Sequence, residues 1–481
     1  MMKALAMVIA FCDGFEHLIQ QMLIITLNPI ARATRKIKKQ DRNILLFISF
    51  IVIAIYFILI YSSIATLIGL RKQLGRHIIG LVLLLAVIVF SVDREQSYVK
   101  WKKIVSVPLI GSGVMMLIVS FIHPIGSGYR VFAIMLIFVF PAIALVWNNR
   151  KDYYVLFNCM GYAIAVVGIG YLLICIIGIR FGWATWEGLR FKGTMSHSGN
   201  LSQLYTSVFC SGLFLFTQNF RRGKVFIFAS IIIGIATGML LLGQGRSCAL
   251  ACIASLMAMN IFFTRYVTKG SRTDAAKKII IAVILIVLTA SLVAKLPALA
   301  PSEPESLLIK TAAAEKGMRD YTSRAEIVTS SVEGEGALDN IKNRFSGENK
   351  DLNQFSSGRI YLWKLVLQNL NWMGHDVEEQ SIHDLTQNDW LIYAHNVFLE
   401  ISYRCGIPLG IVFLLLEYTA GCISLRYLFF NKKGRTYLLF PIMITIVYIS
   451  QSMLDCAGMP FILESGLYYY FALIPMMDRY V

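Results

Sequence analysis

Three short polar stretches, far apart in a very apolar chain, carry the residues best suited to chemistry. One is the pair His395-Asn396, which directly precedes a long apolar run. The second is "LRFKGTMSHSGNL", which contains Arg190, and the third is "GQGRSCALA", which places Arg246 between two apolar runs. The chemistry of this set follows from the residue types.

Two arginines and one histidine suit the transfer of a group away from a phosphate. A guanidinium group binds phosphate oxygens with a planar fork and stays charged at any working pH. Two such groups can hold a pyrophosphate and stabilise the negative charge that grows on it as it leaves. Histidine titrates near neutrality and can remove a proton from a hydroxyl. We therefore predict that Arg190, Arg246 and His395 are catalytic.

Each residue alone has a structural explanation. An isolated arginine at a membrane boundary is most often an anchor whose charge reaches the interface. An isolated histidine there is most often a packed side chain, and Asn396 could cap a helix or hold the imidazole. Three residues that agree in side and depth favour the functional interpretation.

The composition indicates an all-α polytopic membrane protein. The chain has 481 residues, of which 57% are hydrophobic and 15% charged. A membrane-spanning helix needs roughly 20 apolar residues. Twelve such windows occur, at 43–62, 78–93, 104–123, 130–147, 154–179, 202–219, 225–243, 248–266, 278–298, 407–430, 437–455 and 460–477. The stretch 4–29 favours a helix along the interface, because Asp13, Glu16 and His17 fall at its middle.

Basic loops predict the orientation of these spans. They occupy alternate loops, at 32–42, 93–103, 148–152, 220–224, 264–278 and 431–436, while 71–76 is an exception. Lysines and arginines hold loops in the cytoplasm, so the net charge of +17 indicates membrane orientation and not nucleic-acid binding. The three polar stretches then fall on the extracytoplasmic side.

One long loop differs from the rest of the chain. Residues 300–394 hold 15 acidic and 9 basic residues, against 13 and 36 elsewhere. A polar insert of this length is rarely filler, so we predict an outer cap with a helix over 356–370. The predicted parts are an interfacial helix and cytoplasmic basic segment (1–42), nine spans (43–299), an extracytoplasmic loop (300–394), and a motif helix with the last three spans (395–481).

The same stretches resemble the signature of the O-antigen ligase/polymerase superfamily. "HNVFLEISYRCGIPLG" fits its His-Asn, aromatic-Leu and glycine pattern, although Arg404 stands where an acidic residue is common. "LRFKGTMSHSGNL" is similar to its Arg-x-x-Gly…Pro-Asn segment without the proline. "GQGRSCALA" matches its small-Arg-small turn, and "GRIYLWKLVLQNLNWMGHD" resembles its Arg/Trp helix with a glycine turn. The resemblance covers roughly 180–425.

This resemblance implies a GT-C-type glycosyltransferase in the bacterial plasma (inner) membrane. It would take an undecaprenyl-pyrophosphate-linked glycan as donor and a glycan as acceptor, invert the anomeric centre, and use no metal or other cofactor. Arg190 and Arg246 would bind the pyrophosphate and His395 would be the base. The substrate-binding candidates are Lys192, Asn200, Arg359 and Asn396. The lipid bilayer is a partner, nucleic acid is not, and a chain-length regulator is an additional candidate.

Three functions compete. A polymerase joins lipid-linked repeat units of a surface polysaccharide such as an O-antigen, capsule or exopolysaccharide. A ligase moves the glycan from its lipid carrier to lipid A core or another acceptor. A transporter or flippase of the same lipid would carry charge inside the membrane, and Glu417 and Glu464 are the main ionisable groups within the windows. We favour the polymerase, because polymerases are the more diverse branch of the resemblance.

Overall fold

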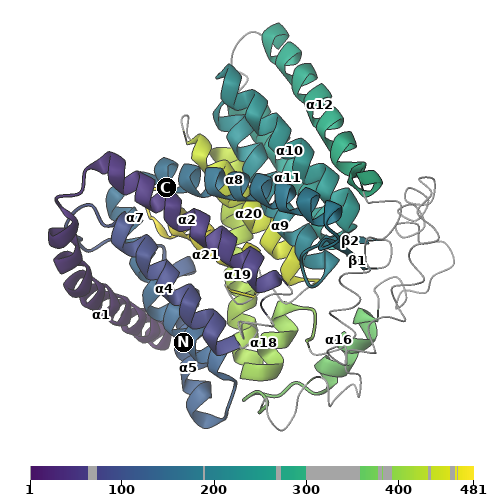
Figure 1. The fold of residues 1–481 in the computed structure, drawn as a ribbon. Coiled ribbons are helices and arrows are strands. Elements are labelled where there is room, and N and C mark those ends of the chain that lie inside the picture. Colours follow the sequence, from purple (N-terminus) through teal and green to yellow (C-terminus); the bar gives the residue numbers. More distant parts are fainter. Residues whose placement is uncertain are drawn as a thin grey trace.

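The computed structural model describes residues 2–62, 65, 73–187, 190–220, 222–266, 272–299, 358–376, 382, 393–431, 435–454, 461–462 and 464–481. These residues form a helical bundle with one small hairpin (Figure 1). The first half contains α1 (Met2–Thr34), α2 (Lys39–Tyr61), α4 (Gln73–Ser91), α5 (Lys103–Ile122), α6 (Ser127–Ile134), the π-helical turn η1 (Met135–Val139), α7 (Phe140–Arg150), α8 (Tyr153–Arg180), β1 (Thr185–Glu187), β2 (Arg190–Gly193) and α9 (Ser198–Gln218). The second half contains α10 (Gly223–Gly243), α11 (Arg246–Tyr266), α12 (Arg272–Ala294), η2 (Leu296–Leu299), α16 (Arg359–Gln368), α18 (Val397–Cys405), α19 (Ile407–Phe430), η3 (Thr436–Leu438), α20 (Leu439–Ser452) and α21 (Glu464–Met477).

The all-α polytopic membrane class is confirmed. Nine of the twelve predicted windows fall on helices that are long and apolar enough to cross a membrane within the described part of the chain. They are Lys39–Tyr61, Leu74–Ser91, Lys103–Ile122, Ser127–Arg150, Tyr153–Arg180, Gly223–Gly243, Arg246–Tyr266, Ala275–Ala294 and Ile407–Phe430. The other three windows fall on α9, α20 and α21, so the predicted count of twelve spans stays a prediction.

The helix α9 lies inside the bundle and not at its surface. It packs against α8, α10 and α11, and its side chains are buried along nearly the whole helix. Three of its hydroxyl groups donate to carbonyls one turn earlier in the helix, as Thr206 does to the Ser202 carbonyl over 2.8 Å. A helix that meets only protein needs less hydropathy than one that meets lipid, which explains why α9 is polar for a span.

The described residues of all six basic loops lie at one end of the bundle, as the alternation of these loops along the chain predicts. Lys39 pairs with Asp152 at 3.2 Å, and the Lys102 amide donates to the Met477 carbonyl over 2.7 Å. The Asn431 amide donates to the Tyr266 hydroxyl over 2.9 Å. Further contacts complete the set, namely Arg150 to the Ser91 carbonyl, Tyr153 to Asp478, Arg435 to the Val481 carbonyl, Thr436 to Gln218 and Lys278 to the Phe220 carbonyl. We call this the basic end.

The predicted site stretches lie at the opposite end, which we call the site end. There the Ser196 amide donates to the Tyr61 carbonyl over 2.7 Å, which ties the segment before α9 to the end of α2. The His123 imidazole contacts the Met373 carbonyl at 2.6 Å, which ties the end of α5 to the turn after α16. In Figure 1, the hairpin lies at the right, α16 at the lower right and α18 at the lower centre, whereas the C-terminus lies at the left above the middle.

The N-terminal helix α1 is not among the candidate spans found in the described residues. It lies against the segment around 95–106 at the basic end. Asp13 pairs with Lys103, and the buried Glu16 carboxylate accepts from the Ser106 hydroxyl over 2.9 Å. The polar groups at the middle of this helix therefore face protein partners. Its placement along the membrane interface stays a prediction.

Most of the predicted cap at 300–394 lies outside the described residues. The described part includes α16, which confirms the helix expected within 356–370. Leu362 and Val366 of α16 form a small second core with Ala394 and Tyr403. This cluster attaches α16 to the segment that carries His395.

Candidate functional site

Arg190 stands on a hairpin that the sequence reasoning did not predict. It opens β2 and lies directly across from Glu187 of β1 in the antiparallel register. Phe191 is fully buried and the Thr194 amide donates to the Tyr171 hydroxyl of α8 over 3.2 Å, so the hairpin is fixed to the bundle. Cross-strand neighbours lie close enough to interact, and Arg190 Nη2 is 3.5 Å from Glu187 Oε1.

The Glu187 carboxylate also caps the start of α9. Its Oε2 accepts from the Ser198 amide and from the Ser198 hydroxyl, both over 2.9 Å. Its Oε1 lies 3.8 Å from His197 Nδ1. Donors from His197 and Ser198 together with the charge of Arg190 hold the pKa of Glu187 well below its usual range. The carboxylate is therefore ionised at any physiological pH.

The two other candidates of this stretch lie on the same segment. Lys192 is half-buried on β2. Asn200 lies in the first turn of α9, where its Nδ2 donates to the Ser196 hydroxyl over 3.1 Å. The structure thus brings Arg190, Lys192 and Asn200 to one corner of the site end.

Arg246 is the first residue of α11 and shares this corner. The turn before it is made by Gln244, which has a left-handed φ of 51°. Arg190 and Arg359 both lie within electrostatic range of the Arg246 guanidinium. Arg246 therefore lies near the positive charges of two residues from separate parts of the chain, and such charges repel one another unless an anion joins them. We call Arg190, Arg246 and Arg359 the arginine group.

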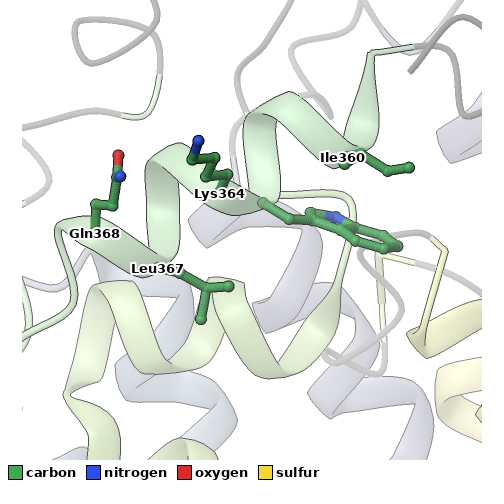
Figure 2. Close-up of a pocket in the computed structure, with 5 residues that line it drawn as sticks. Ile360, Lys364, Leu367 and Gln368 are labelled. Atoms are coloured by element: carbon green, nitrogen blue, oxygen red, sulfur yellow. The ribbon is translucent and has the colours of Figure 1, made fainter. Parts of the chain in front are cut away.

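Arg359 is the first residue of α16. An open groove of about 420 Å³ runs along this helix, lined by Ile360, Trp363, Lys364, Leu367 and Gln368 (Figure 2). In Figure 2, Lys364 and Gln368 extend from the same side of the helix. The groove thus begins one residue from a guanidinium of the arginine group.

His395 lies just before α18, and not in its first turn as expected. Asn396 is the N-cap, with an extended backbone and its Oδ1 accepting from the Leu399 amide over 3.1 Å. Of the two roles considered for Asn396, its side-chain oxygen takes that of capping the helix. His395 has a left-handed φ of 49°, a conformation in which histidine is several-fold enriched among non-glycine residues. Pro408 stands in the first turn of α19, as predicted.

The peptide before His395 is held from two sides. The Trp363 indole donates to the Ala394 carbonyl over 3.0 Å, and the Ala394 amide donates to Glu400 Oε2 over 2.8 Å. Glu400 also pairs with Arg404 one turn later, and both side chains are buried. Arg404, the departure from the family pattern, therefore serves as the counter-charge of Glu400.

A second chain of contacts joins His395 to the arginines. The Asn396 Nδ2 donates to the Met453 carbonyl at the end of α20 over 3.2 Å. Two residues earlier, Gln451 Nε2 donates to the Cys248 sulfur over 3.7 Å. Cys248 lies in the first turn of α11, which begins with Arg246. The base candidate and the arginine group thus belong to one connected region of the site end.

Two carboxylates of this region were missed in the sequence. Glu187 stands in "TWEGLRFKG", where a glycine between two short alternating runs is a hairpin signal that would have paired it with Arg190. Glu400 lies four residues before Arg404, a helical spacing for ion pairs. Its bond to the Ala394 amide has no signal in the sequence.

Comparison with known families finds a match over one part of the chain. The model of a family described as O-antigen ligase matches residues 229–414, which include Arg246, Arg359 and His395. The match confirms the resemblance to the O-antigen ligase/polymerase superfamily. This family implies a glycosyltransferase-type enzyme that acts in a membrane on lipid-linked glycans. No curated protein matches the chain significantly.

Proposed function

We propose that this protein polymerises the oligosaccharide repeat units of a surface polysaccharide, taking each unit from an undecaprenyl-pyrophosphate carrier. The observation that carries the proposal is that Arg246, which lies near the charges of Arg190 and Arg359, belongs to a region of the site end that hydrogen bonds connect to the segment of His395. Such a cationic group fits a pyrophosphate at the membrane surface, while the polyprenyl tail stays in the bilayer.

In this reaction an acceptor hydroxyl attacks the anomeric carbon of the donor sugar. The bond between that carbon and the pyrophosphate oxygen breaks on the opposite face, so the anomeric centre inverts. The His395 imidazole takes the hydroxyl proton, and Arg190 and Arg246 stabilise the charge on the departing lipid pyrophosphate. Arg359 adds a third positive charge to the same leaving group.

The remaining candidates serve the sugars and the base. Lys192 and Asn200 lie beside Arg190 and are placed to contact the head group of the donor. Asn396 acts on His395 through the backbone, because its side chain caps α18 and bonds to α20. The site end faces the periplasmic or outer side of the plasma membrane, because the basic end faces the cytoplasm.

Ligation is the second candidate function, and the description of the matching family favours it. A ligase would use the same arginines and histidine and differ in the acceptor. A strain that lacks the protein distinguishes the two functions. Accumulation of single repeat units on the lipid carrier is expected for a polymerase, whereas accumulation of long lipid-linked polymer would show a ligase.

The proposal is tested by following the lipid-linked glycan with purified protein. Wild-type protein should convert a lipid-pyrophosphate glycan into longer products, read by gel or mass spectrometry. His395→Ala and Arg246→Ala should each abolish the products while the protein still inserts and folds. Extension by a protein that carries both changes would refute the proposed mechanism.

A further inference from the structure

Glu187 lies 3.5 Å from Arg190 and has no role in the proposed reaction. A carboxylate 3.5 Å from an arginine that binds phosphate would repel the donor unless it has a compensating task. The contacts of its two oxygens identify that task, because each oxygen serves a different partner.

One oxygen is anchored. Glu187 Oε2 accepts two hydrogen bonds of 2.9 Å from Ser198 at the start of α9. The positive end of the helix dipole adds to this attraction. The helix α9 is itself buried in the bundle, so the anchor cannot move far. The carboxylate therefore has a fixed position, from which it can restrict the conformation of the Arg190 side chain.

The other oxygen, Oε1, lies 3.5 Å from Arg190 Nη2 and 3.8 Å from His197 Nδ1. The ion pair with Arg190 engages one end of the guanidinium and leaves its other N–H groups for a phosphate. An arginine side chain on a short hairpin has several rotatable bonds, and a single fixed partner restricts which way its planar fork faces. Arg246 lies within electrostatic range and repels Arg190, so the carboxylate also offsets that repulsion before the donor arrives.

We infer that Glu187 is a positioning residue, which orients the Arg190 guanidinium toward the leaving pyrophosphate. The inference rests on the proposed function and adds to it a residue that does not touch the substrate. In the alternative role, the Glu187 carboxylate would occupy the phosphate site and the donor would have to displace it. The hydrogen bonds from Ser198 oppose such a displacement, because they hold the carboxylate independently of Arg190.

The test compares Glu187→Gln with wild type in transfer from a lipid-pyrophosphate glycan. Glutamine keeps an oxygen for the Ser198 amide but removes the charge that attracts Arg190. We expect kcat/KM to fall roughly tenfold or more, since a misplacement of about 1 Å can cost roughly 10²-fold. Glu187→Asp should recover part of the loss. Glu95→Gln, which removes the exposed partner of Arg32, is the matched control and should transfer at the wild-type rate.

The same substitution made in the Arg190→Lys variant distinguishes a positioning role of Glu187 from a purely structural one. In Arg190→Lys the side chain is a point charge without a fork, so adding Glu187→Gln should have less than about a twofold further effect. If Arg190→Lys transfers too slowly to measure, thermal stabilisation by the donor lipid gives the same comparison. An equal loss in both backgrounds would show that Glu187 serves only the fold.

Two other outcomes would overturn the inference. A wild-type kcat/KM for Glu187→Gln would show that Glu187 does not position Arg190, and it would leave the proposed function intact. Tighter donor binding by Glu187→Gln would show that the carboxylate competes with phosphate. Absence of transfer by wild-type protein would instead refute the proposed function, and this inference with it.

Discussion

Single side chains at the site end differ in how firmly they are held. Asn396 and Glu187 each make hydrogen bonds to a helix N-terminus, and Glu400 bonds to the peptide before His395. Fixed neighbours of this kind keep a base and a cation in place without moving during the reaction, which is the condition for electrostatic stabilisation of a transition state.

Replacing His395 by alanine should remove the base. We expect the transfer rate to fall roughly 10²- to 10⁴-fold, the usual contribution of general base catalysis. Initial rates of lipid-pyrophosphate release by the wild type and by His395→Ala check this expectation, and equal rates would contradict it.

Glu187 should not add a pH dependence of its own to the transfer rate. Its pKa is depressed, so the stability it gives is present above the pKa of an unfolded glutamate and is lost only as pH falls through the depressed value. That window lies below any working pH. The pH profile of Glu187→Gln should therefore have the wild-type shape at a lower rate, and a shifted profile would contradict this assignment.

The buried pair of Glu400 and Arg404 gives a prediction of stability. Glu400→Gln keeps an acceptor for the Ala394 amide but leaves a buried guanidinium without its counter-charge. The free energy of unfolding should fall by about 3–5 kcal/mol. Replacing both residues, with Glu400→Gln and Arg404→Met, should recover most of that loss. Thermal unfolding in detergent measures both, and a double variant no more stable than the single one would contradict the pairing.

Neighbouring elements are joined at the site end by a backbone crossing. The turn after α16 passes so close to the end of α18 that a Cβ on Gly406 would lie 2.3 Å from the Trp372 carbonyl oxygen. A Cβ on Gly374 would lie 2.3 Å from the Arg404 carbonyl oxygen. Both glycines also have positive φ, at 94° and 86°. The crossing fixes the helix that follows Arg359 against the helix that follows His395.

Gly406→Ala should loosen this crossing. We expect the free energy of unfolding to fall by more than about 1 kcal/mol, because both the φ angle and the space exclude a side chain. The transfer rate should fall with it. Gly170→Ala in α8 is the matched control, since a Cβ there meets open space. Equal melting temperatures for the two variants would show that the crossing is absent.

The sequence predicts elements better than it predicts contacts. Long apolar blocks and the Gly406-Pro408 junction were enough to place α19, and the alternate basic loops were enough to group the basic end. The hairpin was missed because its strands have three and four residues, too short for a clear alternation. The position of His395 outside α18 depends on which residue takes the N-cap, and the sequence left that open.

The count of spans shows a similar limit. A hydropathy window measures contact with lipid, whereas α9 and α21 are buried among other helices. Glu464 was expected within a span, but it is the first residue of α21 and its amide donates to Tyr61 at the site end over 2.9 Å. Glu417 is buried in α19 and accepts from the Ser452 hydroxyl over 2.8 Å. The Glu464 carboxylate accepts from the Tyr468 hydroxyl over 3.1 Å. Each carboxylate thus has a partner within the protein, as structural groups in a bundle do.

The bundle as a whole separates a basic end from a site end, and its orientation can be measured. A reporter enzyme that is active only outside the cytoplasm should be active when fused after residue 376 and inactive when fused after Val481. The reason is that residues 371–375 contact the site end and Val481 contacts Arg435 at the basic end. The opposite pattern would place the arginine group in the cytoplasm and remove it from an outer-leaflet donor.

The decisive measurement is transfer by purified protein supplied with a lipid-pyrophosphate glycan as both donor and acceptor. Wild-type protein should release free lipid pyrophosphate and yield longer glycans with inverted linkage. Arg246→Ala and His395→Ala, at wild-type thermal stability, should yield neither. Full product formation by either variant, or none by the folded wild type, would contradict a reaction carried by these two residues.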